Sequence, residues 1–466
     1  MRRLALLLAL SSLAFALALP ARRSQGPPLR DFEAYYAAGQ TWHYRGDPYG
    51  RDVWRTEKDV PGVVASRDEL LPFVGPPFGL PLWSALARLP WHAASIVWAF
   101  ALGLAFATIV IGSLAIGRGR LRWFDAGAAL AVAVTFAPLT GGAALGQVAL
   151  VSCAAIVAMP YALRPGGTLG AAALALGAAL QPNLAIVLVA RLAESRTWIA
   201  YGCAAVVAAG ASALALGGPG AFAHYADVLR AQGAAERFSA IQTTPGAVAR
   251  AFGASPALAD VSARAVALAC VIGLVVQAVR RRHAPAIRLA LACALVPLAL
   301  PFAHEHDYAI AFFPSVLLIL RARGAAWVAG ASATVALGVD WLGLAQTPTG
   351  LGAAVALAIA SACALAALPR EPLRPYHALP VLVAPCVAVV GALAAHHPLA
   401  TWPDALPTNY HAELHATAAE VWREEQLRSG IAALDPVWGL LRAIPLAACA
   451  LVWALASRVL VTECER

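Results

Sequence analysis

Side chains that could do chemistry are rare in this 466-residue chain, which is 61% hydrophobic and 13% charged. The first cluster is residues 31–50, DFEAYYAAGQTWHYRGDPYG, with Asp31, Tyr35, Tyr36 and Asp47 as candidate site residues. A carboxylate at a membrane surface can have its pKa tuned by lipid and still reach a polar acceptor, so Asp31 is a candidate general base. A structural interpretation competes with this one, because Asp31 also suits the N-cap of a helix over 32–44 and Asp47 suits a turn.

The second cluster is the run HEHDY at 304–308, with two histidines and two carboxylates in five residues. On a helix, His304 and His306 would point about 200° apart, so a divalent metal shared with Asp307 would require an irregular backbone. The pattern therefore favours hydrogen bonding of His304, His306 and Asp307 to a phosphate or sugar. A metal site and a solvated helix end are the alternatives, and we expect no cofactor.

Two glutamines stand next to apolar segments, Gln147 after Gly146 and Gln181 before Pro182. Polar groups within a membrane need partners and tend to line cavities. Each is a candidate substrate-binding residue, although either could simply satisfy backbone groups. The segment 168–193 has basic residues at both ends, which favours a hairpin of two short helices with Gln181 at its tip over one long span.

These clusters must be positioned by membrane helices. The mean hydropathy is +0.70, and apolar runs recur that can cross a hydrocarbon core of ~30 Å, which predicts an all-α, polytopic bundle of about 12 to 14 helices. Residues 1–466 form a single membrane domain in this interpretation. A cleaved signal peptide is the alternative for residues 1–20, where Ala16-Leu17-Ala18 follows an apolar run.

The distribution of basic residues predicts which loops lie outside the cytoplasm. Both termini are expected in the cytoplasm, and the extracytoplasmic loops are 21–91, 217–257 and 396–436. The polar stretches 140–147 and 304–308 fall on the same face. The short run 76–89 is expected to form a helix along the membrane interface.

Several function classes lack support in this sequence. The net charge of +9 is explained by cytoplasmic loops and membrane lipids, so no nucleic-acid partner is expected. The eight cysteines show no metal-binding spacing, and no phosphate-binding P-loop or hydrolase nucleophile motif is present. An ATP-driven or soluble-type hydrolase activity is therefore not indicated.

The order of short motifs resembles glycosyltransferase family 87. These motifs are, in chain order, D-F-x-x-Y-Y-x-A-G from Asp31, G-D-P-Y from Gly46, P-P-F from Pro76, G-Q at 146–147, Q-P at 181–182 and H-D-Y from His306. The resemblance implies a GT-C type transferase that moves a hexose, typically mannose, from a polyprenyl-phosphate sugar to a lipid or glycan acceptor. It also implies that Asp31 acts as the base. A bacterial inner membrane is the expected location.

The chain departs from the family pattern at two positions, since Gly75 stands where a Tyr is common and Gln181 where a Lys is common. Without that Lys, we expect arginines of the external loops to bind the donor phosphate. A transporter or flippase of a lipid-linked sugar is the alternative function, and a structural membrane subunit is a third. The absence of an inverted repeat and the placement of the charges on one face favour the enzyme.

Overall fold

The protein is an integral membrane protein built from helices. The computed structural model describes residues 2–18, 29–61, 63–118, 122–163, 167–192, 194–279, 284–346, 351–369, 381, 402–431 and 435–462. These residues form α-helices and short 3-10 helices and contain no strand. The predicted all-α polytopic class is confirmed.

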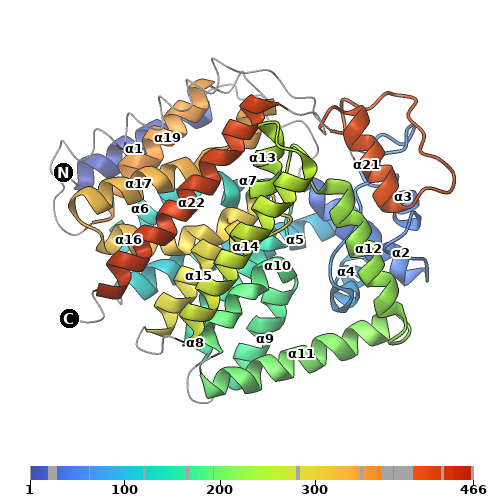
Figure 1. Cartoon of the computed structure of the whole chain (residues 1–466), viewed down its shortest axis with the longest axis horizontal. Helices are drawn as coiled ribbons and strands as arrows, with labels where there is room; N and C mark the ends of the chain where they lie inside the picture. Colours follow the sequence, from blue (N-terminus) through green and yellow to red (C-terminus); the bar gives the residue numbers. More distant parts are fainter. Residues whose placement is uncertain are drawn as a thin grey trace.

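The main bundle contains helices from most of the chain (Figure 1). Its members are α1 (Arg2–Ala18), α5 (Trp91–Arg118), α6 (Trp123–Val134), α7 (Ala137–Leu145), α8 (Ala149–Ala162), α9 (Thr168–Ala179), α10 (Pro182–Ala185), η2 (Ile186–Arg191), α11 (Ser195–Ala215), α14 (Pro256–Val279), α15 (Pro285–Ala299), η3 (Glu305–Ala311), α16 (Phe312–Arg321), α17 (Gly324–Gly338), α18 (Trp341–Gln346), α19 (Leu351–Ala367) and α22 (Pro436–Thr462). Helices α15 and α16 are almost wholly buried in its interior.

Four helices are long and apolar enough to cross a membrane, namely α5, α11, α14 and α22. Helices α6 and α7 make a fifth candidate, bent by 67° at their junction, and the remaining apolar helices have 10–17 residues. Over the described residues, the predicted 12 to 14 spans therefore correspond to at most five helices of full spanning length. The sequence also predicts a membrane span over 378–395, and all of it except residue 381 lies outside the described residues.

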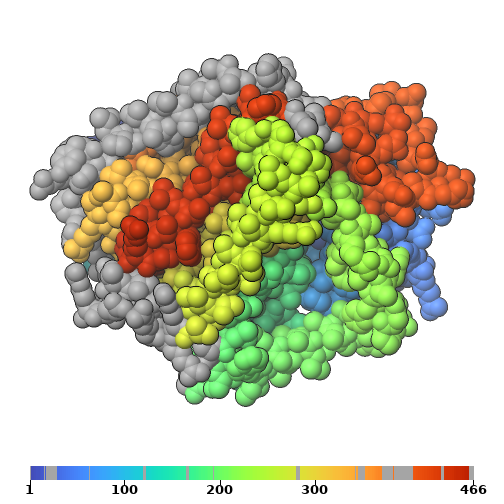
Figure 2. Space-filling view, in the orientation of Figure 1, coloured from blue at the N-terminus to red at the C-terminus, as the bar shows by residue number. Residues whose placement is uncertain are grey.

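A smaller group of helices stands at one end of the bundle, on the right of Figure 1. It comprises α2 (Arg30–His43), α3 (Asp52–Glu57), η1 (Pro77–Gly79), α4 (Leu80–Ala87), α12 (Ala221–Glu236) and α21 (Ala418–Arg428). Helix α13 (Pro245–Ala251) instead packs on α14 and α22 of the bundle. Figure 2 shows the 402–431 segment packed against α12 and the N-terminal residues. The backbone of Asp68 donates to the Tyr410 carbonyl at 2.9 Å, and the Asp68 carboxylate accepts from the Ala412 amide at 3.0 Å.

Two predicted local features are confirmed in this region and one is wrong. Helix α2 forms where a helix was expected, and the 76–89 run folds as η1 and α4. Asp31, however, is not the N-cap of α2. The helix begins at Arg30, and its N-cap is Leu29, which has a left-handed φ of 61° and makes no side-chain capping bond. The Asp31 side chain is thereby left for another role.

Candidate active site

Helix α2 is fixed against the bundle by aromatic packing. Phe32 is fully buried and stacks on Trp98 of α5, with ring centroids 5.5 Å apart. On the neighbouring turn Tyr36 packs edge-on against Trp91, at 5.2 Å. Gly39 lets α4 approach closely, because a Cβ there would lie 2.3 Å from the backbone carbon of Trp83. These contacts hold the first turn of α2, and with it Asp31, against the end of the bundle.

Gly146 brings Gln147 beside Asp31. It ends α7 with a φ of 83°, a conformation that favours glycine, and a Cβ on it would lie 2.8 Å from that of Phe32. Its carbonyl accepts a hydrogen bond from the Trp98 indole at 2.8 Å. The Gln147 amide then donates to the Asp31 carboxylate, and the Gln147 carbonyl accepts a hydrogen bond from the Tyr35 hydroxyl at 3.4 Å.

The site is a cavity of about 260 Å³ between the small helical group and the bundle. Six of the predicted site residues line it, namely Asp31, Tyr35, Gln147, Gln181, His304 and His306. Four stretches that the sequence analysis placed on one face therefore surround one space, since residues of 31–74, 141–147, 232–241 and 302–306 all contribute to its wall.

Asp307 does not line the cavity but supports two residues that do. Its Oδ1 atom accepts from the Gln181 amide at 3.1 Å, and its Oδ2 atom accepts from the backbone N–H of His304 at 3.0 Å. Gln181 occupies the predicted break between α9 and α10. Asp307 thus fixes the start of η3 relative to this break, with the His304 ring directed into the cavity.

Two predicted site residues lie elsewhere. The Tyr36 hydroxyl donates to the Leu89 carbonyl at 2.9 Å, which makes Tyr36 a packing residue of α2. The Asp47 carboxylate accepts from the Tyr49 amide at 3.0 Å and lies 3.3 Å from the His224 ring. Asp47 therefore forms a turn, as its structural interpretation predicted, and it lies away from the cavity.

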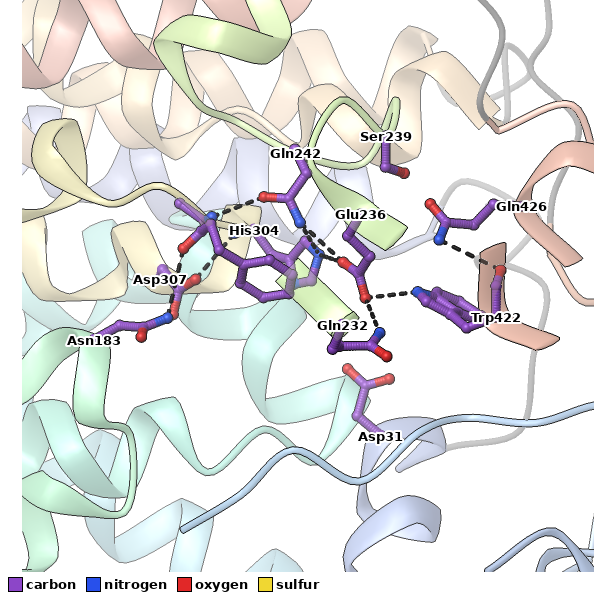
Figure 3. Close-up of polar contacts among 12 residues, drawn as sticks. Asp31, Asn183, Gln232, Glu236, Ser239, Gln242, His304, Asp307, Trp422 and Gln426 are labelled. Atoms are coloured by element: carbon purple, nitrogen blue, oxygen red, sulfur yellow. Dashed lines mark hydrogen bonds and ion pairs between the residues drawn. The ribbon is translucent and has the colours of Figure 1, made fainter. Parts of the chain in front are cut away.

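The centre of the polar network is Glu236, which was not predicted from the sequence. Figure 3 shows its carboxylate between the side chains of Gln232, Gln242, His304 and Trp422, with the Asp31 carboxylate pointing toward the same group. Glu236 is only 4% exposed. Other unpredicted lining residues are Gln232, Trp402 and Trp422. Glu236 and these three residues all fall in loops that were predicted to be external, but no local motif distinguishes them from their neighbours.

The surroundings shift the pKa of the main ionisable groups. Burial raises the pKa of the Asp31 carboxyl, while the Gln147 hydrogen bond and the charge of His304 act in the opposite direction. Burial lowers the pKa of His304, but its hydrogen bond with Glu236 and the charges of Glu236, Asp307 and Asp31 outweigh this, and the net pKa is raised. The pKa of His306 is well below its usual range because of burial and the charge of His304. The site therefore combines a strengthened base with a histidine that is stabilised as a cation.

Neither a metal cluster nor an arginine cluster is seen at the cavity in the described parts of the chain. No three His, Cys, Asp or Glu side chains there are arranged to hold a metal ion. No Lys or Arg is among the described residues of the cavity wall, contrary to the expectation that loop arginines would reach the donor. Arg51 donates to backbone carbonyls of Glu413 and Leu414, and Arg67 pairs with Glu69.

A membrane bundle whose cavity presents a carboxylate beside amide and imidazole side chains is suited to group transfer at a membrane surface. Residues 73–301, just under half of the chain, match the family model described as Glycosyltransferase family 87. Over this region the chain is similar to glycosyltransferase family 87, as the motif order predicted, and this similarity supports a membrane glycosyltransferase. The matched region includes Gln147, Gln181 and Glu236, whereas Asp31 and His304 lie outside it. No curated protein and no solved structure matches the chain.

Proposed function

We propose that this glycosyltransferase is of the GT-C type and transfers a hexose, most simply mannose, from a polyprenyl-phosphate sugar to a lipid or glycan acceptor. The observation that carries this proposal is the Asp31 carboxylate in a cavity whose wall also presents the amides of Gln147 and Gln181 and the ring of His304. Polyprenyl-phosphate sugars are already activated, so such a reaction requires no nucleotide. The extracytoplasmic face of a bacterial inner membrane, with both termini cytoplasmic, is the proposed setting.

In the proposed reaction Asp31 acts as general base. The acceptor hydroxyl gives its proton to the Asp31 carboxylate as its oxygen attacks the anomeric carbon of the donor sugar. The bond between that carbon and the phosphate oxygen breaks, and polyprenyl phosphate leaves with the electron pair. Base catalysis of this kind contributes roughly 10²- to 10⁴-fold to the rate. The Gln147 hydrogen bond orients the carboxylate for this step.

His304 is the proposed partner of the phosphate. A cation near the leaving oxygen stabilises the charge that develops as the bond breaks. His304 is the lining residue whose protonated form is favoured by its neighbours, and no Lys or Arg joins it in the described wall. Gln147, Gln181 and Tyr35 supply the hydrogen bonds expected for sugar hydroxyls.

The test is a transfer assay with purified protein, polyprenyl-phosphate-[¹⁴C]mannose or another labelled hexose, and a membrane lipid extract. The proposal expects radiolabel in a new lipid or glycan product. Transfer absent with every polyprenyl-phosphate hexose, together with movement of the lipid-linked sugar across vesicle membranes, would instead establish the flippase alternative.

A further inference from the structure

Glu236 has an unusual arrangement for a carboxylate that lines an enzyme cavity. Four side-chain groups converge on it. Its Oε1 atom accepts from the Gln232 amide at 2.8 Å and from the Trp422 indole at 2.6 Å, and its Oε2 atom lies 2.9 Å from the Gln242 amide and 3.2 Å from His304 Nε2. A carboxylate offers about four lone-pair sites. The acceptor capacity of Glu236 is therefore filled by protein groups, which leaves it unsuited to take a proton from an acceptor sugar.

These four partners come from three parts of the chain. Gln232 is one turn earlier on α12, Gln242 follows that helix, His304 starts η3, and Trp422 belongs to α21. Gln242 also accepts from the backbone N–H of Ala303 at 2.8 Å, so it fixes the residue before His304 as well. Glu236 thus links α12, η3 and α21 beside the His304 ring.

The charge on His304 depends on few groups. The titratable groups facing its ring are Glu236 from α12, Asp31 from α2, and Asp307 and His306 from η3. The neutral amide of Gln242 also lies 3.1 Å from the Nε2 atom of His304. Glu236 makes the largest contribution that raises the pKa of His304, through both its hydrogen bond and its charge. His306 acts against it, since two imidazolium ions side by side repel each other.

We propose that Glu236 is a positioning residue, which orients the His304 ring and keeps it positively charged to receive the phosphate of the sugar donor. The receiving of a phosphate rests on the proposed function. The effect of Glu236 on the orientation and charge of His304 rests on the geometry alone. Gln181 stands where the resembled family commonly has a Lys. In this proposal, protonated His304 supplies the positive charge that such a lysine would bring to the cavity.

Chemical modification tests the charge of His304 without any activity assay. Diethyl pyrocarbonate reacts with neutral imidazole, so the pH dependence of modification at His304, read by mass spectrometry, reports its protonation. In Glu236→Gln the midpoint for His304 should fall by about 1 pH unit or more, while His92, exposed at the start of α5, provides an internal reference. Glu236→Asp, which retains the charge, should move the midpoint back toward that of the wild type. If Glu236→Gln does not fold, Glu236→Asp still tests the inference, because its shorter side chain withdraws the carboxylate from His304 and should leave the midpoint below that of the wild type.

The transfer assay supplies the second measurement. Transfer should decline as pH rises, because His304 loses its proton. In the Glu236→Gln variant this decline should occur at lower pH than in the wild type, and acidification should restore part of the rate. Glu420→Gln, at an exposed position of α21, is the matched control and should retain the wild-type profile, because this side chain contacts Thr417 and not the cavity.

Two results would overturn the inference. One is a His304 modification midpoint unchanged by Glu236→Gln. The other is a loss of transfer of equal size at every pH, which would make Glu236 a structural residue. If the wild type transfers no sugar at all, the proposed function fails, and the modification midpoint still decides whether Glu236 holds the charge on His304.

Discussion

Replacing Asp31 with Asn tests the assignment of the base with little change in shape. Asn keeps one oxygen that can accept the Gln147 hydrogen bond, and the neighbouring Phe32 packing is untouched. Substrate binding should therefore change little. The rate of transfer should fall by roughly 10² to 10⁴, the usual contribution of a general base. At 1.36 kcal/mol for each factor of ten, this corresponds to about 2.7 to 5.4 kcal/mol in the activation free energy.

The assay follows initial rates of labelled hexose transfer in lipid nanodiscs across a range of pH. The carboxyl pKa of Asp31 is raised by burial above its ordinary value of 3.8. Since the base must be ionised, wild-type activity should decline as pH falls through this raised pKa. The residual activity of Asp31→Asn should lack that decline, because the variant has no carboxyl group at this position to protonate.

Matched variants separate this role from a general effect of charge. Asp47→Asn removes a carboxylate from the same N-terminal region but outside the cavity, and should retain the wild-type rate. Asp340 is a further carboxylate of the cavity wall, and it accepts a hydrogen bond from the Gly343 amide at 2.6 Å. Full activity in Asp31→Asn, combined with a large loss in Asp340→Asn, would refute the assignment of Asp31 and transfer the role to Asp340.

Three further predictions concern stability and topology. Gly39→Ala would place a Cβ 2.3 Å from the Trp83 backbone, so thermal unfolding should show a loss of about 1–3 kcal/mol; Gly103→Ala, with nothing within 4 Å, should match the wild type, and equal stability of the two variants would contradict the packing argument. Burial raises the pKa of Glu425 from 4.5 to about 8, so the unfolded state binds fewer protons between these values and the free energy of unfolding should fall as pH rises through this window. Glu425→Gln should show a smaller fall in thermal stability over that range, and an unchanged slope would exclude this origin. Asp47→Cys should react with a membrane-impermeant maleimide only from the extracytoplasmic side, and labelling solely from the cytoplasm would reverse the proposed orientation.

The sequence predicted elements well where composition alone determines them. Long apolar runs predicted α5, α14 and α22, and the Gln181-Pro182 pair marked a real break. The number of full spans was harder to obtain, because an apolar run predicts burial in lipid or protein without giving its direction. The 67° bend between α6 and α7 occurs within one such run.

The candidate site was predicted in part, for a related reason. Asp31, Gln147 and His304 belong to short motifs, whereas the importance of Glu236 depends on contacts that local sequence does not encode. Its partners His304 and Trp422 are 68 and 186 residues away along the chain. A single glutamate in a polar external helix is ordinarily a solvated residue, so only the tertiary arrangement distinguishes it.

The first turn of α2 shows how one short stretch supplies both structural and reactive charges. Arg30 and Glu33 are three positions apart, on one side of the helix, and pair at 2.6 Å; Arg30 also pairs with buried Glu69. Asp31 is offset by about 100° around the helix axis, so it points instead into the cavity toward Gln147. The ion pair satisfies Arg30 within the protein, which keeps this cation from forming a salt bridge with Asp31. Among the described residues, the direct side-chain partner of this carboxylate is therefore a neutral amide, the condition that a base requires if it is to accept a proton from a substrate.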